Sequence, residues 1–309
     1  MEKYVVGIGA TNVDLYCKSD IEIREHFDHP STIRYTSGGV TRNILENITK
    51  LGLKCKLLTA VGKDIYGNYL LEKTAKVGID NKDIAVIKGG RTGLFVQVQD
   101  KNNDMHLAMC DMSILKHINV EYIKKKAKVF KNASAIVLDP SLDNEVLEYI
   151  FDNYKNIPIF LDPISDVYAA KIKPYLEHIY CIKPNKSELG VLAGINIENH
   201  DDLLKAYNIV LAKGVKKIYV SLGKDGCMYN DENNVVYTRK FREVENVVNA
   251  SGAGDSFFAA IIYSFVNNVS LDDTINNALG AGIAAIICEE TINPKMSIRL
   301  LKKIIKENK

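Results

Sequence analysis

The chain has 309 residues, about twice the length of a typical domain, although large α/β sheets often reach this size as one unit. Hydrophobic residues make up 47% of it and charged residues 25%, which is an ordinary globular composition and excludes a disordered or collagen-like chain. Forty Lys and Arg against 38 Asp and Glu leave a net charge of +2, so we expect no nucleic-acid partner.

No apolar run reaches the ~18 residues that a membrane span needs, so we expect no membrane partner either. The six cysteines are scattered without a Cys-x-x-Cys pair, and the six histidines show no metal-ligand spacing. The simplest interpretation is free thiols in a reducing cytoplasm, and no histidine is given a role.

Short apolar runs alternate with stretches of helical spacing along most of the chain. The expected strands lie at residues 4–10, 55–62, 135–139, 157–162, 179–184 and 217–223, with helices between them near 40–51 and 146–151. Runs this apolar suit strands that are covered on both faces. The alternation predicts an α/β fold, a mostly parallel central sheet flanked by helices. Three helical stretches, at 255–268, 274–290 and 296–309, should also pack on the sheet.

Two segments, residues 15–37 and 92–111, interrupt this alternation. Apolar and polar residues alternate in both, as they do in half-exposed hairpins, and together they predict a small β lid that projects from the body. No internal repeat or low-complexity linker is visible. We therefore expect one domain, residues 1–309, with the lid as an insertion in it.

Polar residues at the end of the first expected strand indicate a site for hydroxyl groups. Asn12 and Asp14 lie where α/β proteins bind ligands, and a carboxylate can accept from two vicinal hydroxyls of a sugar. An Asx turn is the alternative. Gly38 and Gly39 let backbone approach a ligand closely before a helix, with Asn43 one turn further on, although Gly-Gly also occurs in ordinary loops.

The strongest sequence evidence for a catalytic site lies at the start of the helical stretch after Ser251. Small residues at Gly252, Ala253 and Gly254 expose consecutive N–H groups, which together with the helix dipole bind anions. Asp255 in the first turn could accept a hydroxyl proton while these N–H groups hold the charge of a transferring phosphoryl group. The alternative is a glycine-rich helix entry with a capping acid.

Two further motifs suit a nucleotide and its metal ion. Asn185 and Glu188, three positions apart at a strand-to-helix boundary, offer oxygen ligands for Mg²⁺ or its waters, but form a capping box equally well. Ser221, Gly223 and Gly226 follow a strand as a possible phosphate-binding loop. The chain has no GxxxxGK[ST] motif, so phosphoryl transfer here would not use a P-loop.

In this order the motifs resemble the ribokinase-like carbohydrate kinase family, also called the phosphofructokinase B family, over essentially the whole chain. The Gly-Gly segment at 38–52 and the stretch at 249–255 are similar to its two signatures. The resemblance implies a ribokinase-like fold, ATP and Mg²⁺ as cofactors, and Asp255 as the catalytic base. It assigns the anion hole to Gly252, Ala253 and Gly254, the sugar hydroxyls to Asn12, Asp14, Gly39 and Asn43, and the metal and nucleotide to Asn185, Glu188, Ser221, Gly223 and Gly226.

The second signature departs from the family pattern at its start. Asn249 stands where most members have Asp, and Ala250 where many have Thr. The Asp helps to arrange a monovalent-cation site in several relatives, so the departure puts a K⁺ requirement in doubt here.

Four segments resemble one subgroup of the family, the pseudouridine kinases: residues 33–52, 106–115, 161–173 and 289–297. The likeness implies a small-molecule nucleoside as acceptor, phosphorylated on its 5′-hydroxyl. Asp111 is the expected acceptor for the base, with Thr36 or Ser37 beside it, although Asp111 would also suit a helix N-cap. Another sugar or nucleoside acceptor, or a catalytically silent ligand sensor, remains open. Exposed apolar lid residues predict a homodimer joined through the lid: Ile33, Leu94, Phe95 and Met105.

Overall fold

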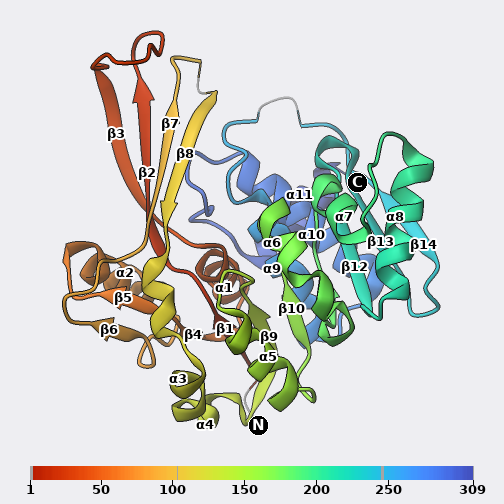
Figure 1. The fold of residues 1–309 in the computed structure, drawn as a ribbon. Coiled ribbons are helices and arrows are strands. Elements are labelled where there is room, and N and C mark those ends of the chain that lie inside the picture. Colours follow the sequence, from red (N-terminus) through yellow and green to blue (C-terminus); the bar gives the residue numbers. More distant parts are fainter. Residues whose placement is uncertain (1–2, 103, 245–246, 309) are drawn as a thin grey trace.

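An eight-stranded sheet forms the centre of the protein in the computed structural model, which describes residues 3–102, 104–244 and 247–308 (Figure 1). Its strand order is β14-β13-β12-β11-β10-β9-β1-β4, and every pairing from β12 to β4 is parallel. The bounds are β1 Tyr4–Ile8, β4 Lys54–Leu58, β9 Ala133–Leu138, β10 Ile159–Leu161, β11 Cys181–Ile182, β12 Lys217–Ser221, β13 Cys227–Asn230 and β14 Val236–Arg239. The predicted fold class is confirmed, since the apolar runs form strands with both faces covered.

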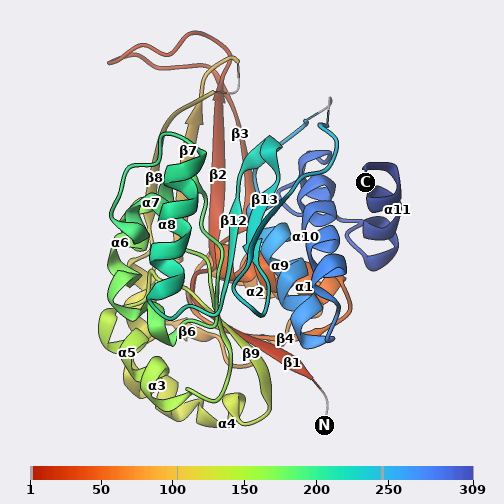
Figure 2. The same ribbon diagram turned by 90° about the vertical axis from the view of Figure 1, so that its right-hand side faces the viewer.

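Helices cover the two faces of this sheet (Figure 2). One layer holds α3 Val120–Lys125, α5 Asn144–Asn153, α6 Asp166–Ile172, α7 Lys186–Ala193 and α8 His200–Ala212. The other holds α1 Val40–Lys50, α9 Ala253–Val266, α10 Leu271–Ile286 and α11 Ile298–Asn308. Of the three predicted C-terminal helices, α9 packs directly on the sheet and α11 packs on α10. Smaller elements are α2 Ile65–Lys76, α4 Ala127–Phe130, the paired strands β5 Ala60–Gly62 and β6 Ala85–Ile87, and the 3₁₀ turns Ser113–His117, Lys173–His178 and Gly223–Asp225.

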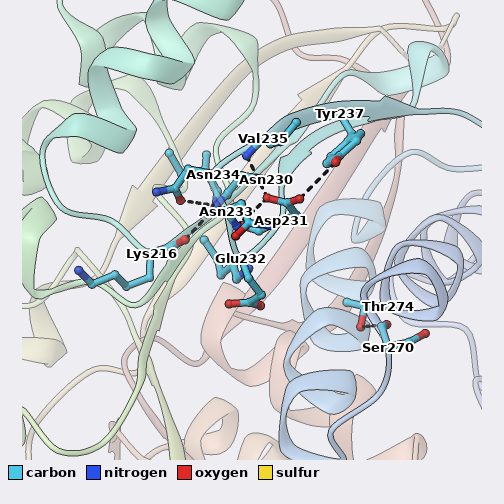
Figure 3. A network of polar contacts seen from close by, with 12 residues as sticks. Lys216, Asn230, Asp231, Glu232, Asn233, Asn234, Val235, Tyr237, Ser270 and Thr274 are labelled. Atoms are coloured by element: carbon cyan, nitrogen blue, oxygen red, sulfur yellow. Dashed lines mark hydrogen bonds and ion pairs between the residues drawn. The ribbon is translucent and has the colours of Figure 1, made fainter.

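The antiparallel hairpin β13–β14 at one edge of the sheet was not predicted. Its turn is organised by Asp231, whose carboxylate accepts from the backbone N–H groups of Asn233 at 2.8 Å and Val235 at 2.9 Å and from the Tyr237 hydroxyl at 3.2 Å (Figure 3). Asn230 beside it is buried and bridges strands through its side chain. This polar network therefore stabilises the turn of the hairpin and its attachment to β12.

A second, four-stranded sheet rises from the carboxyl-end side of the body (Figures 1 and 2). Two antiparallel hairpins form it, β2 Asn12–Ser19 with β3 Ser31–Gly38 and β7 Leu94–Gln99 with β8 Met105–Asp111, joined by the parallel pairing of β2 with β7. We call it the lid sheet. Its strands begin at Asn12, slightly before the predicted segment.

The register of the lid sheet sorts its side chains onto two faces. Asp14 lies opposite Thr36 and Phe95, and Phe95 lies opposite Cys110. Because directly paired residues project to the same side, these four share one face, which we call the inner face. The residues that alternate with them along each strand project to the opposite side, which we call the outer face. They include Ile33, Tyr35, Leu107 and Met109.

Two further sequence expectations can be compared with the structure. All six cysteines are free. Among the residues described, no helix combines the length and the apolar character that crossing a membrane would require.

Candidate active site

The candidate site lies where the carboxyl ends of the central parallel strands meet the base of the lid sheet. Asp162 directly follows β10, Lys183 directly follows β11, and Asn12 and Asp14 begin β2. The N-terminus of α9 faces the same region, because Asp255 in its first turn contacts Asn43 of α1. Charged side chains from distant segments therefore converge at the edge where α/β proteins bind ligands.

Asp14 is held in a pocket built for its carboxylate. The side-chain amide of Asn12 donates to Asp14 Oδ1 at 2.5 Å, and a Cβ on Gly38 would overlap the same carboxylate. Burial raises the pKa of Asp14 to about 6, against the lowering effects of the Asn12 hydrogen bond, the Arg42 charge and the Tyr16 hydroxyl. The predicted group of Asn12, Asp14 and Gly38 is thus one local unit.

Gly39 shapes the entry to α1. It has a φ of 99°, and a Cβ at this position would overlap the carbonyl oxygen of Ala10. A side chain is therefore excluded by the neighbouring strand–loop connection. This close packing places the start of α1, and with it Asn43, beside the end of β1.

A hydrogen bond joins Asp255 to Asn43, one of the residues predicted to bind the sugar hydroxyls. Asn43 Nδ2 donates to Asp255 Oδ2 at 2.9 Å, across 212 positions of sequence. Burial, followed by the nearby Asp162 charge, raises the pKa of Asp255 to about 7, while Asn43 and Lys183 act in the opposite direction. A carboxyl group with a pKa near neutrality suits a general base.

The turn before Asp255 presents backbone N–H groups to this region. Gly252 has a φ of 77° and is the N-cap of α9, and no side chain among the described residues caps it. A Cβ on Gly252 would overlap the carbonyl oxygen of Thr291. The first N–H groups of a helix attract anions, here at the start of a 14-residue helix, and the Ala253 N–H also makes a long contact of 3.4 Å with the Ala250 carbonyl oxygen.

The pair of Lys183 and Asp162 was missed in the sequence. Lys183 Nζ lies 3.1 Å from Asp162 Oδ2, and both side chains are buried. Although burial opposes it, the charges of Asp162, Glu188 and Asp255 raise the pKa of Lys183, which therefore stays an ammonium. A Cβ on Gly254 would lie 3.4 Å from Lys183 Nζ. The Lys183 charge is therefore beside residues 252–254, the turn that begins α9, which we call the α9 turn. The sequence did offer a signal, since Asp162 and Lys183 each directly follow a buried strand.

Asn185 and Glu188 form a capping box at the start of α7. Glu188 Oε2 accepts from the Asn185 N–H at 2.8 Å, and Asn185 Oδ1 accepts from the Glu188 N–H at 2.9 Å. Burial and the Asp162 charge raise the pKa of Glu188 to about 7. In the described part of the chain, no group of three or more His, Cys, Asp or Glu side chains could hold a metal ion. Mg²⁺ often takes one carboxylate, with phosphate oxygens and waters as its other ligands, and Glu188 fits that limited role.

The predicted nucleotide loop borders an open cavity of about 670 Å³. Ser221 lines it directly, and Gly223 and Gly226 have φ values of 60° and 86° in the tight turn that follows. The volume lies in the range of small-molecule sites. The cavity is lined by Asn185, Lys186, Ser187, Glu198, Asn199, His200, Leu203, Ser221, Leu222, Asp225 and Thr238.

The structure does not bring Asp111 together with Asp14. Asp111 is exposed, projects to the outer face of the lid sheet, and accepts a hydrogen bond from the Ser113 N–H at 2.9 Å. Hydrogen bonds from the side chain and then the backbone of Ser113 lower the pKa of Asp111. Thr36, by contrast, is directly opposite Asp14 on the inner face. Its Oγ1 is buried, and within the described residues it has no hydrogen-bond partner. Ser37 projects to the outer face.

Asn249 uses both ends of its side-chain amide within the protein. Nδ2 donates to the Glu289 carbonyl oxygen and Oδ1 accepts from the Ser251 N–H, each at 3.0 Å. The neutral amide holds the loop before the α9 turn without adding a negative charge there.

Comparison with known proteins gives consistent results. A family model described as "pfkB family carbohydrate kinase" matches residues 2–298. The pseudouridine kinase of Escherichia coli is 33% identical over 296 residues, covering 96% of this chain and 94% of that protein. The uncharacterized sugar kinase YeiI, also from Escherichia coli, is 30% identical over 96% of this chain and 82% of its own length. The Arabidopsis thaliana ribokinase complexed with ribose and ATP superposes with a TM-score of 0.86 at 20% identity, over 99% of both chains, which supports the fold.

Proposed function

The chain belongs to the pfkB family of carbohydrate kinases and is an ATP-dependent kinase, and from this premise we propose that it phosphorylates the 5′-hydroxyl of pseudouridine, giving pseudouridine 5′-phosphate and ADP. The observation that carries the chemistry is the contact of Asn43 with Asp255, with the buried Asp14 carboxylate close by. The acceptor is chosen from the 33% identity to a pseudouridine kinase over nearly the whole chain.

In the proposed reaction, Asp14 accepts hydrogen bonds from the ribose hydroxyls and Asn12 holds its carboxylate in place. Asp255 takes the proton of the 5′-hydroxyl as the oxygen attacks the γ-phosphorus of ATP. The N–H groups of Gly252, Ala253 and Gly254 and the Lys183 ammonium stabilise the charge on the transferring group. The lid sheet excludes water, which would otherwise compete as the acceptor.

ATP is proposed to enter from the cavity beside Ser221, with Gly223 and Gly226 shaping the loop under its phosphates. Asn185 lines this cavity, and Glu188 lies one turn further along α7. The Glu188 carboxylate is proposed as the ligand of Mg²⁺ or of its waters. Bound Mg²⁺ would neutralise charge on the phosphate oxygens. We also propose that the enzyme works in the cytoplasm, since six free cysteines suit a reducing compartment.

The principal alternative is a family kinase for another acceptor, such as ribose, fructose or a purine nucleoside. The sugar kinase YeiI is almost as similar as the pseudouridine kinase, and the site residues described above would serve a ribosyl acceptor of either kind. A catalytically silent sensor fits less well, because the buried Asp255 beside a glycine-rich helix start has no evident structural task.

ADP release with ATP and Mg²⁺ across pseudouridine, uridine, ribose, adenosine and fructose tests the proposal. The highest kcat/KM is expected for pseudouridine, whose ring carries an extra N–H donor that uridine lacks. A buried acceptor left unpaired by uridine costs about 1–3 kcal/mol, or roughly fivefold to 160-fold in kcat/KM. Comparable kcat/KM for the two nucleosides would contradict pseudouridine as the acceptor, and no turnover of any of the five would favour the silent sensor.

A further inference from the structure

Arg42 in α1 is the largest fully buried side chain among the described residues, with 1% of its surface exposed. Its Nη2 donates to Glu46 Oε2 at 2.6 Å, one turn along the helix, and its Nη1 donates to Asn43 Oδ1 at 3.4 Å. Its Nε is buried and finds no hydrogen-bond partner in the part of the chain that the structure describes. A buried guanidinium with an unsatisfied donor costs stability, so packing alone does not explain it.

The contact with Asn43 determines which way that amide points. Its oxygen receives the Arg42 hydrogen bond, and its Nδ2 donates to Asp255. The reversed amide would set its NH₂ group against the guanidinium donors and its oxygen against the Asp255 carboxylate. Both contacts would then be repulsive. Arg42 therefore favours the one orientation in which Asn43 can hold Asp255.

The same guanidinium acts on the second carboxylate of the acceptor site. Its positive charge opposes the burial-driven rise in the pKa of Asp14. The other groups that act on Asp14 are Asn12 and the Tyr16 hydroxyl, and Tyr69 of α2 also feels the Arg42 charge. Around Asp255 the charged groups are Asp162, Lys183 and Asp14. Arg42 is the cation that acts on Asp14, whereas Lys183 acts on Asp255.

We infer that Arg42 is a positioning residue of the acceptor site: anchored on Glu46, its guanidinium orients the Asn43 amide toward Asp255 and sets a fixed positive charge beside Asp14. The inference rests on the proposed kinase function but not on which acceptor is used. It predicts two separable effects, one on turnover through Asn43 and one on acceptor binding through Asp14.

Steady-state kinetics from about pH 6 to about pH 9 with Arg42→Met, Arg42→Lys and the double variant Arg42→Met/Glu46→Gln test this inference. Arg42→Met should raise the acceptor KM severalfold near pH 6, because without the Arg42 charge the pKa of Asp14 rises and less of its carboxyl group is ionised, and the increase should shrink at higher pH where Asp14 ionises again. Its kcat should fall roughly tenfold or more because Asn43 is no longer fixed. Arg42→Lys keeps the charge but not the two-nitrogen geometry, so KM should stay near wild type while kcat falls.

The double variant separates positioning from simple charge pairing. It removes the Glu46 carboxylate that Arg42→Met leaves buried without its 2.6 Å partner, so its melting temperature should recover while KM and the pH profile stay shifted. Recovery of wild-type KM and pH profile together with stability would overturn the inference. So would wild-type kcat in Arg42→Lys, which applies even if the other two variants fail to fold. Lys50→Met is the matched control, because Lys50 approaches Glu46 at 3.7 Å from one turn further along α1, and this variant should leave the kinetics unchanged. A wild type inactive on every acceptor would contradict the proposed function instead.

Discussion

At the scale of single residues, the candidate site depends on buried carboxyl groups that are costly to keep ionised. Burial is the main cause of the raised pKa values of Asp14, at about 6, and Asp255, at about 7. A folded-state pKa above the unfolded value means that the folded protein binds more protons. These two groups therefore lower the free energy of unfolding as the pH rises from about 4 through 7. The chain retains them at a cost in stability, as expected for groups that act in the reaction.

Asp255→Asn should lower kcat by at least ~10²-fold with little change in acceptor affinity, because removing a general base acts on the transition state. The same substitution should raise the melting temperature at pH 8, since it removes a charge that is costly to bury there. Steady-state kinetics and a thermal melt on one preparation check both. Wild-type turnover in this variant would show that another group is the base.

In wild-type protein, kcat/KM should fall as the pH drops through about 7, because protonated Asp255 cannot accept the hydroxyl proton. The pKa of Asp14, about 6, adds a second loss below that pH. A pH–rate profile of ADP release measures this directly. A profile that stays flat down to pH 5 would contradict the assigned roles of both carboxyl groups.

Asp14→Ala should chiefly weaken acceptor binding, by roughly 1.5–3 kcal/mol for lost charged hydrogen bonds, and should hardly affect ATP binding. Isothermal titration with each ligand separates the two. Weakened ATP binding with unchanged acceptor binding would reverse the assignment of the two subsites.

At the scale of elements, the α9 turn has a steric requirement that distinguishes its two glycines. Gly252 adopts a positive φ and a Cβ there would overlap the Thr291 carbonyl, whereas a Cβ on Gly254 meets only Lys183 Nζ at 3.4 Å. Gly252→Ala should therefore displace the turn, lowering both the melting temperature and kcat, while Gly254→Ala should leave the melting temperature near wild type. Equal melting temperatures for the two variants would show that the turn is not so constrained.

The lid sheet contains the groups best placed to distinguish one base from another. Thr36, on the inner face opposite Asp14, has a buried hydroxyl that the described residues leave without a partner. Thr36→Val should therefore reduce the preference for pseudouridine over uridine, measured as the ratio of kcat/KM values. Asp111→Ala is the comparison, since Asp111 lies on the outer face and accepts from the Ser113 N–H. A larger effect from Asp111→Ala would favour the sequence-based hypothesis and would require the lid sheet to move on binding.

These two elements also show what the sequence could and could not predict. The buried runs predicted the parallel strands, and the Gly-Ala-Gly-Asp segment predicted the α9 turn, because both patterns are local. The face occupied by Asp111 depends on strand register, in which a shift of one residue reverses every side chain. The role proposed for Arg42 depends on the tertiary contact of Asn43 with Asp255, and Lys183 meets Asp162 across two strand ends, so no local pattern identifies either pair of partners.

At the scale of the whole molecule, the outer face of the lid sheet is apolar and, beyond its base where Val13, Leu15 and Leu94 pack near α2, open. Ile33 is 65% exposed and Met109 70% exposed, with Tyr35 and Leu107 beside them, whereas Phe95, first expected in this surface, faces inward. Large apolar side chains on an uncovered sheet usually mark an interface, and the outer strands β3 and β8 are unpaired edges of this sheet.

We therefore predict a homodimer in which two lid sheets cover each other's outer faces. Light scattering at micromolar concentration should give twice the chain mass, and Ile33→Lys/Met109→Lys should give the monomer, because burying two charges there costs more than the contact provides. Val167→Lys, at a residue of α6 that is 76% exposed, is the control and should remain dimeric. Since Asp14 and Thr36 lie on the inner face of the same sheet, the monomeric variant should also bind the acceptor more weakly. A wild-type protein with the mass of one chain would contradict the predicted assembly.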